Sequence, residues 1–157
     1  MHASDHQPGG WVFRTGHRLM GALPAQIWRW RADPGGVVGI VAFHRIADGP
    51  DDGLSFPPGR FRELCAYWRA EYNVLPLDAI FTPLPATRVR RLVLTFDDGY
   101  ADNAETAAPI LEQFGLPATF FLTTDFLGAP AGSAFPWDSR GHPAPGIMSW
   151  RQAEALA

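Results

Sequence analysis

The sequence of 157 residues contains no lysine, so all 13 of its basic side chains are arginines. This excludes, within the chain, a Schiff-base enzyme, a P-loop ATPase and a lysine general base. A single cysteine, Cys65, excludes an internal disulfide and a cysteine-based zinc cluster. The candidate chemistry must therefore come from other side chains.

An excess of positive charge is also missing, and so are long apolar segments. The formal net charge of −3 provides no overall positive field that would hold a nucleic acid. No apolar run approaches the ~20 residues of a membrane span, and Met1–Gly10 is polar rather than a secretory signal. A cytoplasmic protein is expected by default, but the location stays unknown because an absent upstream segment would hide an export signal. The oligomeric state is equally unknown.

Strand and helix patterns alternate along the chain, which is 46% hydrophobic and can build a packed core. The apolar, β-branched run Val37–Phe43 predicts a strand buried on both faces. The elements expected after it are a helix over Arg60–Tyr72, a short strand over Val74–Leu77, a strand over Leu92–Phe96, a helix capped by Asp102 or Asn103 and reaching Phe114, and a strand over Ala118–Leu122. This order predicts a parallel α/β sheet or barrel.

The last residues predict a helix that is cut short. Ser149 and Gln152 have the spacing of a capping box, and the sequence then ends at Ala157 after about two helical turns. We therefore expect the chain to be an N-terminal fragment of a larger domain.

Two adjacent acids, Asp97 and Asp98, follow the apolar strand Leu92–Phe96 directly. The carboxyl ends of parallel strands are where α/β folds place their sites, and Gly99 allows a sharp exit from the strand. Neighbouring side chains there point in different directions, so one carboxylate can bind a metal while the other faces water or substrate. The same tripeptide at Asp51–Gly53 has no strand before it and is interpreted as a turn.

A longer pattern surrounds these acids. Its parts are Leu94–Tyr100, Asn103, Ala108–Leu111 and Phe114–Leu122, with Val41–Ile46 and Phe61–Leu77 before them and Met148–Trp150 after them. Together they resemble the first signature block, and its surroundings, of the polysaccharide deacetylases (NodB-homology, carbohydrate esterase family 4). The resemblance extends over roughly residues 37–157.

This resemblance implies a fold and an activity. The fold is a partial (β/α) barrel, distorted and with fewer than eight strands, whose N-terminal portion is residues 36–157, preceded by an N-terminal extension over residues 1–35. The activity is the metal-dependent removal of N-acetyl groups from a carbohydrate. By the same resemblance, Asp97 is the general base and Asp98 is a ligand of a divalent metal, commonly zinc.

The sequence departs from the family at the metal site. The family's other two ligands are histidines four residues apart, located after the helix that here begins at Ser149. The five histidines of this chain do not supply them: they are His2, His6, His17, His44 and His142. We therefore expect the chain to be inactive by itself, and to hold zinc only if the missing histidine ligands are supplied.

Three further residues are candidates for contact with substrate. His44 follows the first strand and lines the substrate cleft in one interpretation; in the other it is a core histidine bonded to the backbone. Tyr100 either reaches the substrate or packs on the next helix. Trp137 either stacks on a sugar ring or, as we expect, is buried under its loop.

Three functions are compatible with these observations. The first is a carbohydrate deacetylase, split or truncated, acting on an N-acetylated sugar that the sequence does not specify. The second is a degenerate carbohydrate-binding module that has lost its metal site. The third is a different α/β hydrolase with a metal site built on Asp97 and Asp98.

Overall fold

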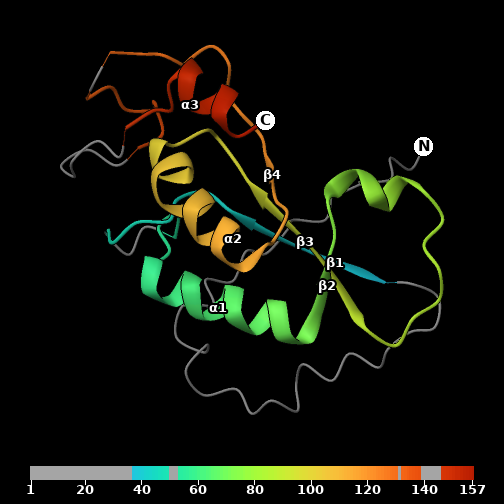
Figure 1. Ribbon diagram of the computed structural model, residues 1–157. Helices are drawn as coiled ribbons and strands as arrows, with labels where there is room; N and C mark the ends of the chain where they lie inside the picture. The colour runs from blue at the N-terminus through green and yellow to red at the C-terminus, as the bar shows by residue number, and fades with distance from the viewer. Residues whose placement is uncertain (1–36, 50–52, 131, 139–145) are drawn as a thin grey trace, which may run out of the picture.

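The computed structural model describes residues 37–49, 53–130, 132–138 and 146–157. The expected N-terminal extension over residues 1–35 lies outside this part of the chain. The described strands form one four-stranded sheet in which every pairing is parallel (Figure 1). The strands are β1 (Val38–Phe43), β2 (Tyr72–Val74), β3 (Arg90–Phe96) and β4 (Thr119–Phe120). The predicted parallel α/β sheet is therefore confirmed, while its closure into a barrel stays a prediction.

The central strand is β3, which pairs with all three of the other strands. On one side β1 runs beside it, with Phe43 level with Phe96. On the other side β2 pairs with its beginning and β4 with its end, where Phe96 is level with Phe120. The carboxyl ends of β1, β3 and β4 thus lie at one edge of the sheet. Residues that follow these strands are brought together there.

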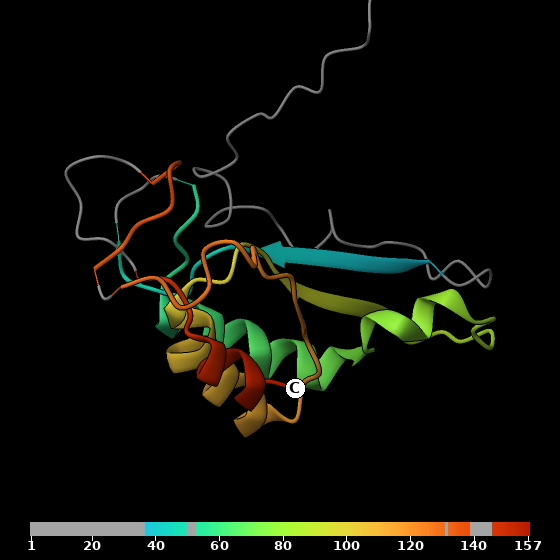
Figure 2. The same cartoon turned by 90° about the horizontal axis from the view of Figure 1, so that it is seen from above.

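Helices α1 (Pro58–Glu71), α2 (Ala108–Phe114) and α3 (Trp150–Ala155) lie on one face of the sheet (Figure 2). A short 3₁₀ helix, η1 (Leu77–Phe81), follows β2, and a π-helical turn, η2 (Asn103–Ala107), leads into α2. The prediction of helix up to Phe114 is confirmed, and the Ser149 capping box is present. Pro109 lies in the first turn of α2. Proline is tolerated there because the first N–H groups of a helix have no partner within it, whereas proline in the helix interior would remove a hydrogen bond and clash with the preceding turn. Gly115 ends α2 with a φ of 60°, the left-handed conformation that glycine adopts without strain.

The core lies between the sheet and the helices. Leu92, Leu94 and Phe96 of β3 face it, because alternate residues of a strand share one face. Phe96 stacks on Phe43 and on Phe120, with ring centroids 5.6 Å and 4.9 Å away respectively. Helix α1 adds Phe61, Cys65 and Trp68 to the same core. Burial raises the pKa of the Cys65 thiol to about 11, so it packs as a neutral residue.

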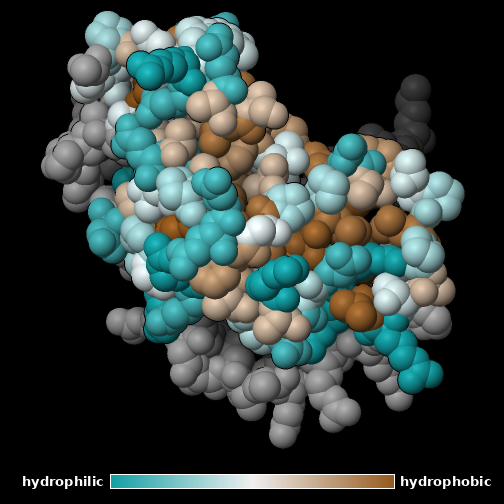
Figure 3. All heavy atoms as spheres, in the orientation of Figure 1, coloured by the Kyte–Doolittle hydropathy of each residue, from teal (hydrophilic) through white to brown (hydrophobic). Residues whose placement is uncertain are grey.

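Three strand predictions were wrong in their detail. The short strand expected over Val74–Leu77 is instead Tyr72–Val74, and Leu77 begins η1. The first strand is not buried on both faces: Ile40 and Ala42 are exposed, because among the described residues β1 pairs only with β3 and no described helix covers this face. The strand expected over Ala118–Leu122 is shorter, because only Thr119 and Phe120 pair with β3. Several large apolar side chains consequently reach the surface, and Figure 3 shows apolar residues between polar ones on one face of the molecule.

None of the described helices has the length and hydrophobicity that a membrane crossing requires.

The assignment of the core predicts that two phenylalanines contribute very differently to the free energy of unfolding. Phe61 is fully buried against Phe43 and Phe96, whereas Phe81 in η1 is 79% exposed. Phe61→Ala should lower the free energy of unfolding by about 3–5 kcal/mol, because it removes apolar contacts and leaves a cavity. Phe81→Ala is the matched control and should cost far less. Urea unfolding followed by circular dichroism measures both, and equal losses in the two variants would contradict this assignment of the core.

Candidate active site at the carboxyl end of β3

The chain leaves β3 through a tight turn centred on Asp98. The Asp97 N–H still donates to the Phe43 carbonyl oxygen at 2.8 Å, so Asp97 continues the pairing of β3 with β1. The Gly99 N–H then donates to the Asp97 carbonyl oxygen at 3.0 Å, which closes a three-residue turn. Asp98 has a φ of 74° and is the only non-glycine residue with positive φ in the described part of the chain. Such strain costs of order 1–3 kcal/mol and is typical of functional sites.

This turn brings the Asp98 carboxylate to His44, which follows β1. His44 Nδ1 lies 2.8 Å from Asp98 Oδ2. An ionised carboxylate only accepts hydrogen bonds, so Nδ1 donates and Nε2 of a neutral ring is left with a free lone pair. The two side chains are 37% and 21% exposed, so the pair is reachable from solvent. His44 is therefore not the backbone-bonded core histidine of the second interpretation. Its predicted contact with substrate stays a prediction.

The segment that carries His44 is held by two polar residues at the start of η2. Asp102 Oδ1 accepts a hydrogen bond from the Ile46 N–H at 2.8 Å. With the Asn103 amide oriented so that its nitrogen faces these two acceptors, it donates to the His44 carbonyl oxygen at 3.0 Å and to Asp102 Oδ1 at 3.1 Å. The N-cap prediction was thus wrong, because the Asp102 side chain makes no cap hydrogen bond to the helix. In the sequence the adjacent pair Asp102 and Asn103 gave only the signal of a helix N-cap, so this role was missed.

Burial changes the acidity of Asp102. Removal from water, with a smaller contribution from the charge of Glu105, raises the pKa of its carboxyl group to about 6. The Ile46 N–H and the Arg45 guanidinium act in the opposite direction and lower this pKa. Asp102 Oδ2 is buried and has no hydrogen-bond partner among the described residues. A neutral carboxyl group therefore suits this position better than a carboxylate.

Tyr100 is fully buried, although sequence made it a candidate for contact with substrate. Its hydroxyl donates to Asp138 Oδ1 at 2.7 Å, and it also accepts from Trp137 Nε1 at 3.2 Å. Burial and the bond to Asp138 raise the pKa of Tyr100 well above its ordinary value, so the phenol stays protonated. The Tyr100 hydroxyl is thus engaged within the protein, by Asp138 and Trp137.

The Asp97 side chain is half-buried, and no hydrogen bond from another described residue reaches its carboxylate. His2, His6, His17, His142 and the aspartates of the second Asp-Asp-Gly lie outside the described residues. Within the described residues, no group of three histidine, cysteine, aspartate or glutamate side chains converges as a metal site. The structure therefore brings Asp98 and His44 together but does not complete a three-ligand centre from the part of the chain that it describes.

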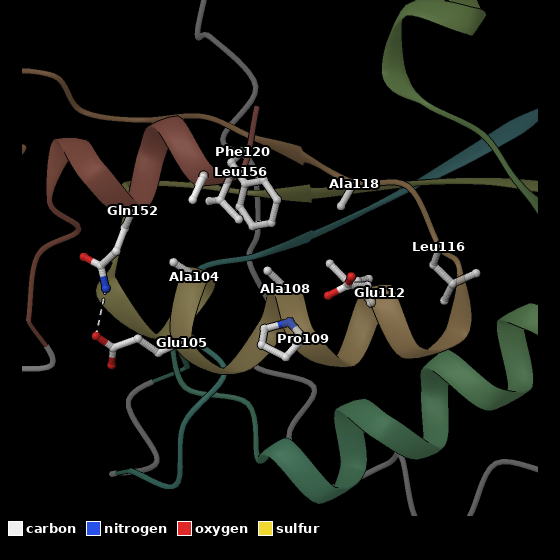
Figure 4. A pocket seen from close by; sticks show the side chains of 12 residues that line it. Ala104, Glu105, Ala108, Pro109, Glu112, Leu116, Ala118, Phe120, Gln152 and Leu156 are labelled. Carbon is white, nitrogen blue, oxygen red and sulfur yellow. Dashed lines mark hydrogen bonds between the residues drawn. The ribbon is translucent and has the colours of Figure 1, made fainter.

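A hollow of about 550 Å³ lies elsewhere, between η2, α2, β4 and α3 (Figure 4). Small and apolar side chains line it, including Ala104, Ala108, Phe120 and Leu156. At one end Gln152 Nε2 donates to Glu105 Oε1 at 2.8 Å, which links α3 to η2. Neither Asp97 nor Asp98 lines this hollow, so it is separate from the candidate active site.

The raised pKa of Asp102 predicts a specific pH dependence of stability. The unfolded chain loses this proton near pH 4, whereas the folded protein keeps it up to about pH 6. The contribution of Asp102 is therefore fully present below pH 4 and is lost as pH rises through 6, by up to about 3 kcal/mol. Asp102→Asn should remove this part of the fall in unfolding free energy between pH 4 and 7.

Urea unfolding at several pH values measures the effect, and the exposed Asp125 provides the matched control as Asp125→Asn. The control should keep the pH profile of the parent protein. A profile for Asp102→Asn that also follows the parent would show that Asp102 does not titrate abnormally.

Comparison with known proteins finds similarity in the region that contains the candidate active site. A family model described as polysaccharide deacetylase matches residues 85–150. The Bacillus subtilis (strain 168) protein YxkH, whose name assigns it to the polysaccharide deacetylases, is 30% identical over 94 residues. That alignment covers 57% of this chain and 33% of YxkH.

Solved deacetylase structures share the fold. A de-N-acetylase from Aggregatibacter actinomycetemcomitans superposes with a TM-score of 0.61 at 22% identity, covering 76% of this chain and 50% of the other. The BpsB deacetylase domain from Bordetella bronchiseptica gives 0.53 at 26% identity, with the same two coverages of 76% and 50%. The chain therefore spans a third of the curated relative and about half of these solved chains.

The match to the polysaccharide deacetylase family model includes the turn that carries Asp97 and Asp98, so residues 85–150 are similar to a part of a polysaccharide deacetylase domain.

Proposed function

We propose that the protein in which this chain occurs is a hydrolase that removes N-acetyl groups from a carbohydrate. The observation that carries this proposal is that the carboxylates of two adjacent acids have different surroundings. The turn at Asp98 holds that carboxylate against His44, while the Asp97 carboxylate accepts no hydrogen bond from the other described residues. One acid is therefore fixed in place and the other is available to take up a proton.

Asp97 is proposed as the general base. A carboxylate in this role must accept a proton from the water that attacks the acetyl carbonyl carbon. Asp97 is half-buried at the strand end, beside the solvent-accessible pair of Asp98 and His44. Its backbone N–H is anchored to β1, so the side chain starts from a fixed point in the sheet. After water attacks the carbonyl carbon, the C–N bond breaks and the proton taken up from the water passes to the leaving nitrogen, so acetate is released and a free amine stays on the sugar.

Asp98 is proposed as a ligand of a divalent metal, with zinc the candidate from the family resemblance. When bound, such an ion polarises the acetyl carbonyl and lowers the pKa of its water. The described residues fit only a part of such a site, because they offer this carboxylate and the nearby imidazole of His44 but no group of three ligands. We therefore propose that the 157 residues alone are inactive and that further ligands are required.

His44 is proposed to have two roles. Its Nδ1–H orients the Asp98 carboxylate, as imidazole and carboxylate partners do around metal ligands. Its ring is also open to solvent in part, which allows it to line the substrate cleft. Tyr100 contributes indirectly, by supporting Trp137.

The role of Asp97 is tested with the whole protein that contains this chain. Asp97→Asn should lower the rate of acetate release from an N-acetylglucosamine oligomer by about 10²–10⁴-fold, because the amide cannot take up the proton. The matched control is Asp51→Asn in the second Asp-Asp-Gly, which should keep the parent rate.

Undiminished acetate release by Asp97→Asn would reject this residue as the base. A protein that binds the oligomer but releases no acetate with added zinc would instead be the carbohydrate-binding module that the sequence leaves open. Zinc-dependent acetate release by the 157 residues alone would refute the need for further ligands.

The role of Asp98 is tested by Asp98→Asn, again in the whole protein. Asparagine is the non-glycine residue that, with aspartate, best tolerates positive φ, so the turn should persist while the negative charge is lost. Zinc affinity measured by titration calorimetry should fall at least about tenfold. The control, Asp125→Asn, should bind zinc as the parent does. Unchanged affinity and stoichiometry in Asp98→Asn would remove Asp98 from the metal site.

A further inference from the structure

We propose that Trp137 provides a stacking surface for a sugar ring, next to the turn that carries Asp97 and Asp98. This inference rests on the proposed function, since it names a binding surface for the same carbohydrate. It also corrects the expectation that Trp137 is buried under its loop, because the side chain is 46% exposed.

Trp137 is exposed and yet held in place on several sides. Its ring stacks on Phe135, with centroids 4.8 Å apart and planes within 9° of parallel. Phe126 packs edge-on against both rings, at 5.8 Å from Trp137 and 5.4 Å from Phe135. Because Phe135 covers one face of the indole, the exposed area belongs to the opposite face and the rim. The platform, defined as Trp137, Phe135 and Phe126, thus offers one open aromatic face.

The polar groups around the platform are satisfied internally. Trp137 Nε1 donates to the Tyr100 hydroxyl, which in turn donates to Asp138 Oδ1. Asp138 Oδ2 accepts from the Phe135 N–H at 2.8 Å, so one carboxylate joins the platform backbone to Tyr100. The indole N–H is therefore already used. What remains for a ligand is the flat apolar face of the ring.

Tyr100 connects the platform to the candidate active site. It lies two residues after Asp98 in the same turn, and its hydroxyl bonds both to Trp137 Nε1 and to Asp138 Oδ1. The Tyr100 ring also packs edge-on against Phe135 with centroids 4.8 Å apart. The platform is thus built directly onto the turn of residues 97–100.

A pyranose ring is the ligand that this surface fits. One face of such a ring presents C–H groups, which pack on an aromatic face while the hydroxyl groups around the rim remain in water. A single exposed indole face is far smaller than the roughly 800 Å² per partner of a stable protein interface. Holding the indole before the ligand arrives reduces the entropy lost on binding. A sugar unit of the same carbohydrate that carries the reacting acetyl group is therefore the expected occupant.

The test measures binding without turnover. An N-acetylglucosamine oligomer is titrated into the whole protein in the presence of a chelator, and affinity is read by calorimetry. Trp137→Ala should weaken binding about tenfold, the size of one aromatic contact of about 1.4 kcal/mol. Trp137→Phe keeps a smaller ring and should lose less. Trp150→Ala is the matched control, because Trp150 in α3 is 53% exposed but lies outside the platform, and it should keep the parent affinity.

A second measurement covers the case in which Trp137→Ala disturbs the loop. The indole N–H resonance of Trp137, assigned by its absence from Trp137→Phe, should shift when the oligomer is added to the parent protein. Three results would contradict a role of the platform in binding. They are equal affinity of the parent and Trp137→Ala, a Trp137 resonance that does not move when the oligomer is bound, and no binding of the oligomer by the parent.

Failure of the platform and failure of the proposed function give different results. Without the platform, acetate release still depends on Asp97. Without the deacetylase activity, the oligomer still binds through Trp137 and no acetate is released by any variant.

Discussion

The parallel pairing of β1 with β3 is the constraint on which the candidate site depends. It sets Phe43 level with Phe96, so the two strands end together and their next residues, His44 and Asp97, leave the sheet side by side. A shift of the register by one residue would move His44 away from Asp98 and would turn its side chain to the other face. The hydrogen bond between His44 and Asp98 is a direct result of this register.

The site contains unfavourable features that the core must offset. Asp98 is held at a positive φ, and Asp102 is a buried carboxyl group with one oxygen that lacks a partner among the described residues. The stack of Phe43, Phe96 and Phe120 fixes the ends of three strands with large apolar rings, and Asp98 follows Phe96 by two residues. Strain and polar burial persist only where the surrounding structure determines the conformation strongly. The aromatic stack gives this turn such surroundings.

Local patterns predicted the elements of the fold, but they could not predict the long-range contacts of the site. The strand before Asp97 and the capping box at Ser149 are encoded within a few residues, and both are present. The contacts of His44 with Asp98 and of Ile46 with Asp102 join residues 54 and 56 positions apart, so only the sheet register reveals them. Exposure of Ile40 was missed for a similar reason, since an apolar run does not show which of its faces another element covers. Exposure of Trp137 was missed because its partner Phe135 lies in an irregular loop without periodicity.

The turn of residues 97–100 explains how four consecutive positions serve different purposes. The Asp97 N–H still bonds to Phe43 at the end of β1, whereas Asp98 is turned away by the positive φ that closes the turn. Gly99 completes the reversal, and a side chain there would come within 3.3 Å of Leu122. Tyr100 then points into the protein and bonds to the loop of Trp137 and Asp138. Because the backbone changes direction at each step, Asp97 stays half-buried at the strand end, Asp98 reaches His44 and Tyr100 reaches the loop of Asp138. A plain extended strand end could not send these side chains to such different surroundings.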